Sequence, residues 1–170
     1  FEILAQRLPV NAVSVTSHLL RTHQTLESIE NSGLKIKKPF IDKRLGEQDF
    51  GDWVGKTYDE AQKLFAESYN QFWLAPASEK PPNGESFLEV LERVQTCVRE
   101  LTLKFKGEDI ICVAHGGPIR AAIALALGLN GDQAMSFSID NLSTTVIDYI
   151  HPENGFHGGW RVRGTNLPSV

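Results

Sequence analysis

A histidine that directly follows a short apolar run has the clearest chemical potential in this sequence. Residues 110–114 are apolar and rich in β-branched types, His115 follows them, and Gly116, Gly117 and Pro118 come next. Such a run predicts a strand buried on both faces, as in a parallel sheet covered by helices. Ligands of open α/β sheets bind at the carboxyl ends of strands, and the N-terminus of the following helix attracts anions. The junction therefore suits a phosphate site, although a structural histidine at a tight turn fits the same residues equally well.

Arg21 is the second candidate, because it lies early in a helix that should follow another short strand. Residues 12–16 predict that strand by their β-branched content, Ser17 is the expected N-cap, and the helix should run over residues 18–31. Helical side chains lean toward the N-terminus, so the guanidinium should point at the carboxyl edge of the sheet. There it could grip a phosphate with two parallel hydrogen bonds. A solvated surface arginine is the alternative, and the local sequence alone favours it.

The rest of the chain alternates helical and extended patterns around these two segments. Capping boxes of the form Thr57-x-x-Glu60 and Ser86-x-x-Glu89 open two predicted helices. These helices, and a third helix before Gly128, are expected over residues 57–68, 86–105 and 119–127. Two later strands, at residues 144–150 and 159–162, should be joined by a hairpin-type turn. The alternation predicts an α/β fold, a three-layer α/β/α sandwich with a mostly parallel central sheet, in a single domain spanning residues 1–170.

Composition narrows the classes of function. The net charge is −4 and Lys and Arg are scattered, which argues against a nucleic-acid partner. No apolar window is long enough to span a bilayer, and no basic leader precedes an apolar segment. Cys97 and Cys112 lack metal-ligand spacing and predict reduced packing residues in a cytoplasmic protein. The aromatic residues Tyr69, Phe72 and Trp73 fit either a packed core or a homodimer interface.

Four segments taken together resemble the histidine phosphatase superfamily, which includes the cofactor-dependent phosphoglycerate mutases. Residues 17–25 resemble its Ser-x-Leu-x-Arg-x-x-Gln-Thr segment, and residues 44–57 resemble the acid-bearing loop of its phosphatase branch. Residues 84–86 resemble its substrate-side loop, and residues 114–117 its second catalytic histidine motif. The segments follow the family's order over nearly the whole chain. The resemblance therefore implies a phosphoglycerate mutase-like fold.

The resemblance also implies a phosphoryl-transfer enzyme that uses no metal and no cofactor. In such enzymes one histidine attacks phosphorus and becomes phosphohistidine, a carboxylic acid protonates the leaving oxygen, and water then releases phosphate. Glu47 matches the acid, Arg21 a phosphate ligand, and His115 the second histidine, which stabilises the transferring group. These roles agree with the physics, because charge on the equatorial phosphoryl oxygens is stabilised by cationic and N–H donors.

Substrate contacts are implied for a smaller set. Gly116 lies beside the histidine, and Glu85 and Ser86 belong to the substrate-side loop. Ser86 is equally the cap of its helix, and that interpretation is preferred. The expected substrate is a small phosphorylated metabolite whose identity the sequence does not specify.

One family motif is missing from these residues. Arg-His-Gly, which carries the nucleophilic histidine on the first strand, is absent, and the other four histidines stand in different contexts: His18, His23, His151 and His157. The nucleophile is therefore expected upstream of Phe1, on a strand that the present residues lack. Three functions stay open. A phosphatase leads, a catalytically inactive relative that binds a phosphorylated ligand or a protein partner is the alternative, and a phosphoglycerate mutase ranks below both.

Overall fold

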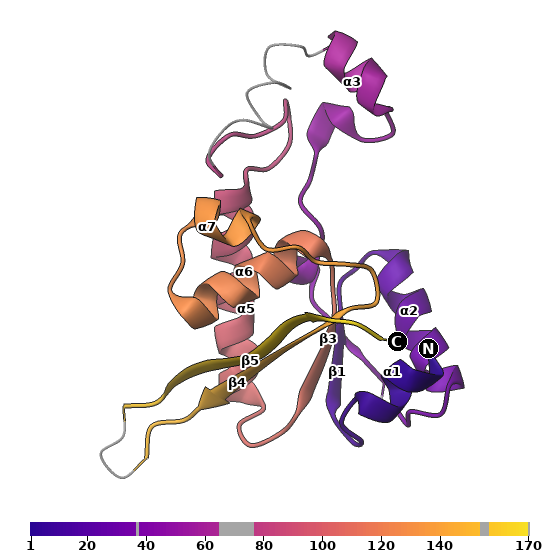
Figure 1. The fold of residues 1–170 in the computed structure, drawn as a ribbon, viewed down its shortest axis with the longest axis vertical. Helices are drawn as coiled ribbons and strands as arrows, with labels where there is room; N and C mark the ends of the chain where they lie inside the picture. The colour runs from indigo at the N-terminus through magenta and orange to yellow at the C-terminus, as the bar shows by residue number, and fades with distance from the viewer. Residues whose placement is uncertain (37, 65–76, 154–156, 170) are drawn as a thin grey trace.

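Three parallel strands form the centre of the structure, a computed structural model that describes residues 1–36, 38–64, 77–153 and 157–169 (Figure 1). Their order in the sheet is β2 (Phe40–Ile41), β1 (Val13–Thr16), β3 (Ile110–Val113). β1 pairs with both neighbours in parallel, and Thr16 lies opposite Val113. Parallel neighbours end at the same edge, so the residues after β1 and β3 meet there. The predicted α/β fold with a central parallel sheet is confirmed.

Helices cover both faces of this sheet. One face carries α1 (Glu2–Arg7) and α2 (Leu20–Asn31), and the other carries α5 (Phe87–Lys104) and α6 (Gly116–Leu127). Side chains alternate along a strand, so each face has its own core. The first core contains Leu4, Ala5, Ala12, Ile29, Leu34 and Ile111. The second contains, among others, Val15, Val90, Val94, Leu101, Ala121 and Ala124. α2 carries Arg21, and α6 begins with the glycines after His115. The two helices lie on opposite faces of the sheet and start at the same edge of it.

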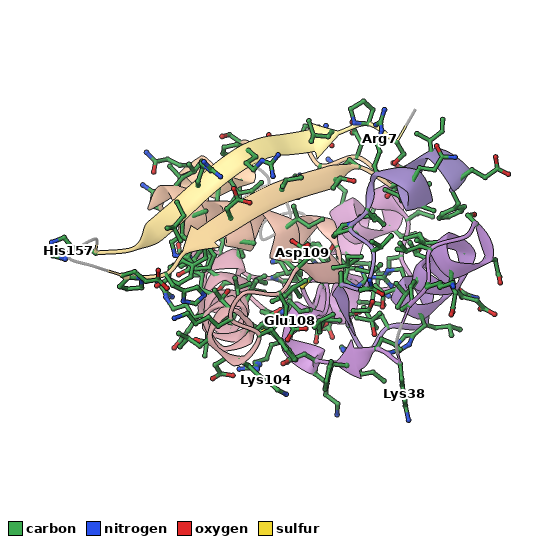
Figure 2. All side chains as sticks on the ribbon, turned by 90° about the horizontal axis from the view of Figure 1, so that it is seen from below. Arg7, Lys38, Lys104, Glu108, Asp109 and His157 are labelled. Atoms are coloured by element: carbon green, nitrogen blue, oxygen red, sulfur yellow. The ribbon has the colours of Figure 1, made fainter. Side chains whose placement is uncertain are left out.

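A separate antiparallel hairpin packs beside α6. It consists of β4 (Thr144–Ile150) and β5 (Gly159–Leu167), the second of which extends further than predicted. Figure 2 shows the hairpin reaching out to His157 at one end and toward Arg7 at the other. There Arg7 Nη1 donates to the carbonyl oxygen of Pro168 at 2.6 Å, which ties α1 to the segment after β5.

Short helices occupy the loops that surround the sheet edge. They are η1 (Lys43–Leu45), η2 (Gly51–Trp53), α3 (Tyr58–Leu64) and α7 (Gly131–Met135). Reciprocal hydrogen bonds between Thr57 and Glu60 confirm the predicted capping box at α3. The aromatic group Tyr69, Phe72 and Trp73 lies outside the described residues. No helix in the described part of the chain is long and apolar enough to cross a membrane.

Two predicted helix starts were wrong. α2 begins at Leu20 with Leu19 at its N-cap, so Ser17 is not the cap. Its hydroxyl instead accepts from the backbone N–H of Leu19 and faces His115. α6 begins at Gly116 rather than at Ile119. Pro118 is accommodated in this first turn because N–H groups there have no partner within the helix.

The burial of β3 also differs from expectation. The prediction was a strand buried on both faces, yet Cys112 is exposed while its neighbour Ile111 is buried. Among the described strands β3 pairs only with β1, so it forms an edge of the sheet. α7 was not predicted at all, although Asn130 and Gln133 form a capping box at its start.

The cap of α5 gives a test of the fold. Ser86 Oγ accepts from Glu89 N while the Glu89 carboxylate accepts from Ser86 N. Ser86→Ala should lower the free energy of unfolding by about 1 kcal/mol, the usual contribution of such a cap. Ser28→Ala, within α2, removes a hydroxyl without removing a cap and should change stability by less than about 0.5 kcal/mol. Urea unfolding of both variants measures the difference, and equal effects would contradict the capping role.

Candidate active site

The register between β1 and β3 brings Ser17 and His115 into contact. Ser17 follows the last residue of β1, and His115 comes shortly after β3, at the N-cap of α6. Ser17 Oγ lies 2.9 Å from His115 Nε2. Both side chains are buried, with only 8% of His115 exposed. The strand pairing alone therefore joins two segments that are far apart in the sequence.

Arg21 determines which nitrogen of the histidine carries the proton. Its Nε lies 3.1 Å from His115 Nδ1, and an arginine N–H can only donate. Nδ1 therefore accepts, and the ring proton sits on Nε2, where it is donated to Ser17 Oγ. Ser17 Oγ also accepts from Leu19 N at 3.2 Å, so its own hydrogen turns to Thr22 Oγ1 at 3.1 Å. Thr22 Oγ1 donates to the Leu19 carbonyl oxygen at 2.8 Å, which completes this series of hydrogen bonds.

This environment favours the neutral imidazole. Burial is the main cause that lowers the pKa of His115, and the positive charge of Arg21 lowers it further. The carboxylate of Glu47 acts in the opposite direction but does not outweigh them. A buried base without a close anionic partner loses its proton more readily. His115 therefore serves this site as a neutral hydrogen-bonding group.

Glu47 lies at the N-terminus of α6. Its Oε1 accepts from the backbone N–H of Gly117 at 3.1 Å and from that of Gln48 at 3.0 Å. The first-turn N–H groups of a helix are unpaired and favour a negative charge. A Cβ at position 117 would lie 2.5 Å from Glu47 Oε1, so any side chain there would displace the carboxylate. The absence of a side chain at Gly117 therefore lets the Glu47 carboxylate approach the start of α6 closely.

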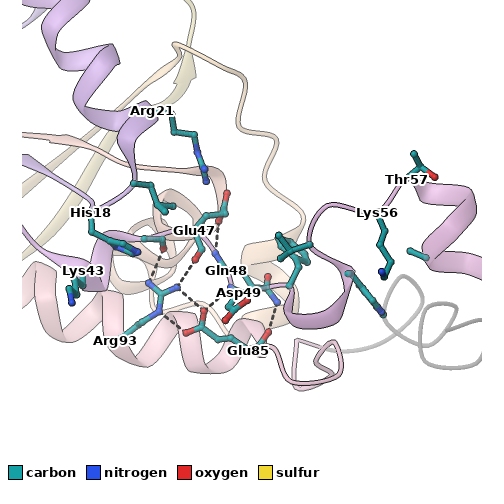
Figure 3. A pocket seen from close by; sticks show the side chains of 16 residues that line it. His18, Arg21, Lys43, Glu47, Gln48, Asp49, Lys56, Thr57, Glu85 and Arg93 are labelled. Carbon is teal, nitrogen blue, oxygen red and sulfur yellow. Dashed lines mark hydrogen bonds and ion pairs between the residues drawn. The ribbon is translucent and has the colours of Figure 1, made fainter. Parts of the chain in front are cut away.

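A cleft of about 860 Å³ opens beside these groups. Its lining includes Arg21, Glu47, Lys43, Lys56 and Trp53, as Figure 3 shows for the labelled charged side chains. His115 is not part of the lining, but it contacts Arg21, which is. In the described part of the chain, the terminal N–H groups of Arg21 donate to no protein acceptor and are available to an anion. No cluster of three or more His, Cys, Asp or Glu suited to a metal occurs among the described residues.

The residues expected to contact substrate have different surroundings. The Glu85 carboxylate lines the cleft but is paired with Arg93 at 2.6 Å. Ser86 caps α5, which confirms the preferred interpretation of that residue. Gly116 is the first residue of α6, where an added Cβ would lie 3.2 Å from Arg120 Nη1.

Two residues of this region were missed from the sequence. Ser17 was predicted to cap a helix, but the pairing of β1 with β3 brings its hydroxyl to His115. Arg93 was not singled out, because its acceptors lie mostly in the distant loop around Glu47. Nothing in its local pattern separates it from a solvated helix arginine.

Comparison with known proteins gives consistent matches. The profile of the histidine phosphatase superfamily (branch 1) matches residues 2–163. A phosphoglycerate mutase from Schizosaccharomyces pombe is 33% identical over 124 residues, or 71% of this chain and 59% of the mutase. The chain spans 39 to 62% of the length of the curated relatives that it matches.

Solved structures agree in fold. Bacillus stearothermophilus YhfR superposes with a TM-score of 0.80 at 28% identity, covering 96% of this chain and 80% of that protein. A mycobacterial glucosyl-3-phosphoglycerate phosphatase in complex with VO3 gives 0.77 at 28% identity, covering 98% and 81%.

The lowered pKa of His115 predicts how stability depends on pH. The unfolded chain binds a proton more readily than the folded one, so protonation favours unfolding. The free energy of unfolding should be highest above the ordinary histidine range and fall between about pH 7.5 and 5.5. Urea unfolding across this range measures the slope, and His115→Gln should reduce it. His157→Gln, at the exposed end of the hairpin, should leave it unchanged; an unaltered slope in His115→Gln would contradict the assignment.

Proposed function

The chain belongs to branch 1 of the histidine phosphatase superfamily, and we propose that it hydrolyses small phosphomonoesters through a phosphohistidine intermediate. One observation carries the proposal. Arg21 has free N–H donors beside a cleft that also contains the Glu47 carboxylate, and both lie at the edge where His115 follows β3. A cationic donor and a carboxyl group on one cleft are what phosphoryl transfer to and from oxygen requires.

The residues divide the chemistry between them. The terminal N–H groups of Arg21 hold the phosphate oxygens, while His115 fixes the Nε of that arginine and through it stabilises the transferring group. A histidine of an Arg-His-Gly motif, supplied by residues upstream of Phe1, attacks phosphorus and the ester P–O bond breaks. Glu47, as the carboxylic acid, gives its proton to the departing oxygen. Water then attacks the phosphohistidine, loses a proton to Glu47, and phosphate leaves.

A phosphatase is favoured over a mutase by the loop after the acid. Residues 49–53, Asp-Phe-Gly-Asp-Trp, resemble the phosphatase branch. The relatives include both phosphoglycerate mutases and a mycobacterial glucosyl-3-phosphoglycerate phosphatase. The two functions are separated by adding a bisphosphorylated primer, which a mutase requires and a phosphatase does not.

An inactive relative that binds a phosphorylated ligand or a protein partner is the second candidate. Turnover by the full-length gene product would exclude it. Phosphate binding without turnover would support it.

Substitution at the site tests the mechanism. In the full-length gene product, Glu47→Gln should lower kcat on an alkyl phosphate by about 10² or more, since general acid catalysis contributes roughly 10²–10⁴. His115→Ala should lower kcat by at least about 10-fold because the support of Arg21 is lost. Phosphate release assays measure both, with Glu92→Gln, an exposed carboxylate on α5, as the matched control. Activity unchanged in both site variants would overturn the mechanism.

A further inference from the structure

From the contacts of its guanidinium, we infer that Arg93 is a positioning residue that holds Glu47 in place for proton transfer. The inference rests on the function proposed above. Arg93 lies on α5, and its side chain is 22% exposed. Figure 3 shows it reaching from that helix to the loop that carries Glu47.

Three backbone carbonyls of one loop converge on this side chain. Nη1 of Arg93 donates to the carbonyl oxygens of Arg44 at 2.6 Å and Gly46 at 2.9 Å. Nη2 donates to the carbonyl oxygen of Glu47 itself at 3.2 Å. Because all three carbonyls bind one guanidinium, these hydrogen bonds hold the backbone of residues 44–47 in a turn around it. The backbone of the proposed acid is therefore held directly.

Glu85 takes the remaining donors. Nε of Arg93 donates to Glu85 Oε1 at 2.6 Å, and Nη2 donates to Oε2 at 2.8 Å. A guanidinium has five N–H groups, and here all five have protein acceptors. Arg93 lines the cleft but has no donor left for a phosphate. It differs in this from Arg21, whose terminal N–H groups are free, so Arg93 positions the loop rather than binding the substrate.

Glu85 holds the residues that follow Glu47 in the loop. Glu85 Oε2 accepts from Asp49 N at 3.2 Å, and the Glu85 carbonyl accepts from Gln48 Nε2 at 2.7 Å. Glu85 N donates to the Asp49 carbonyl at 2.8 Å. Together Arg93 and Glu85 bracket Glu47 on both sides along the chain.

Placement matters because proton transfer requires donor and acceptor within hydrogen-bond reach. A displacement of about 1 Å from productive geometry can cost roughly 10²-fold in rate. Without Arg93, three carbonyls would lose their shared donor and the Glu85 carboxylate would lose its partner. A lysine has three donors on one nitrogen, so it would replace only part of the network.

A comparison of two substrates separates positioning of the acid from a general structural role. p-Nitrophenyl phosphate has a stable leaving group and needs little acid assistance, whereas glycerol 2-phosphate has an alkoxide leaving group that must be protonated. The full-length gene product and its Arg93→Met variant are assayed on both substrates. The ratio of the two kcat/KM values reports the step in which the leaving group departs, and it does not depend on the fraction of folded enzyme. Arg93→Met should lose at least about 10-fold more kcat/KM on glycerol 2-phosphate, and Arg93→Lys should recover part of that loss.

The controls identify which proposal fails. Arg99→Met, an exposed arginine on the same helix, should leave the ratio unchanged. Suppose that Glu47→Gln shows the preferential loss but Arg93→Met loses activity equally on both substrates, or loses none. That result would overturn the role of Arg93 alone. No turnover of either substrate by the wild type, or no preferential loss in Glu47→Gln, would overturn the proposed function instead.

Discussion

The parallel pairing of β1 with β3 is the constraint on which the site depends. It sets the residues after Thr16 and Val113 side by side, so Ser17 and His115 meet at one sheet edge. Both side chains are buried, which makes an unpaired polar atom there costly. The hydroxyl and Arg21 together satisfy both ring nitrogens. A shift in this register would leave the imidazole without partners and Arg21 without its support.

Charges around the cleft are divided into structural and available ones. Arg93 is saturated by protein acceptors, and Arg44 is paired with Asp42 and Glu100. The pairing with Arg44 holds the pKa of Asp42 at about 2. The terminal N–H groups of Arg21 have no acceptor among the described residues. Arg44 and Arg93 are therefore used to hold the loop, while the cleft retains the Arg21 cation for an anionic ligand.

Local signals in the sequence predicted local structure well. The capping box at Ser86 predicted the start of α5, and the apolar run before His115 predicted β3. The sequence could not reveal that the Ser17 hydroxyl would contact His115, at the N-cap of α6, rather than cap its own helix. The exposure of Cys112 likewise depends on which strands flank β3, and such pairing is a property of the assembled sheet.

In the site, too, residues marked by their own type were predicted, and residues defined by distant contacts were not. Arg21, Glu47 and His115 were candidates because their types and the family resemblance single them out. Arg93 contacts mainly carbonyl oxygens, and every residue type carries one, so no side-chain pattern marks its partners. The same fact has an evolutionary consequence. A loop held by its backbone can exchange a side chain that faces the cleft, such as Lys43, without loosening its anchor, so substrate preference can diverge while the geometry of the acid is inherited unchanged.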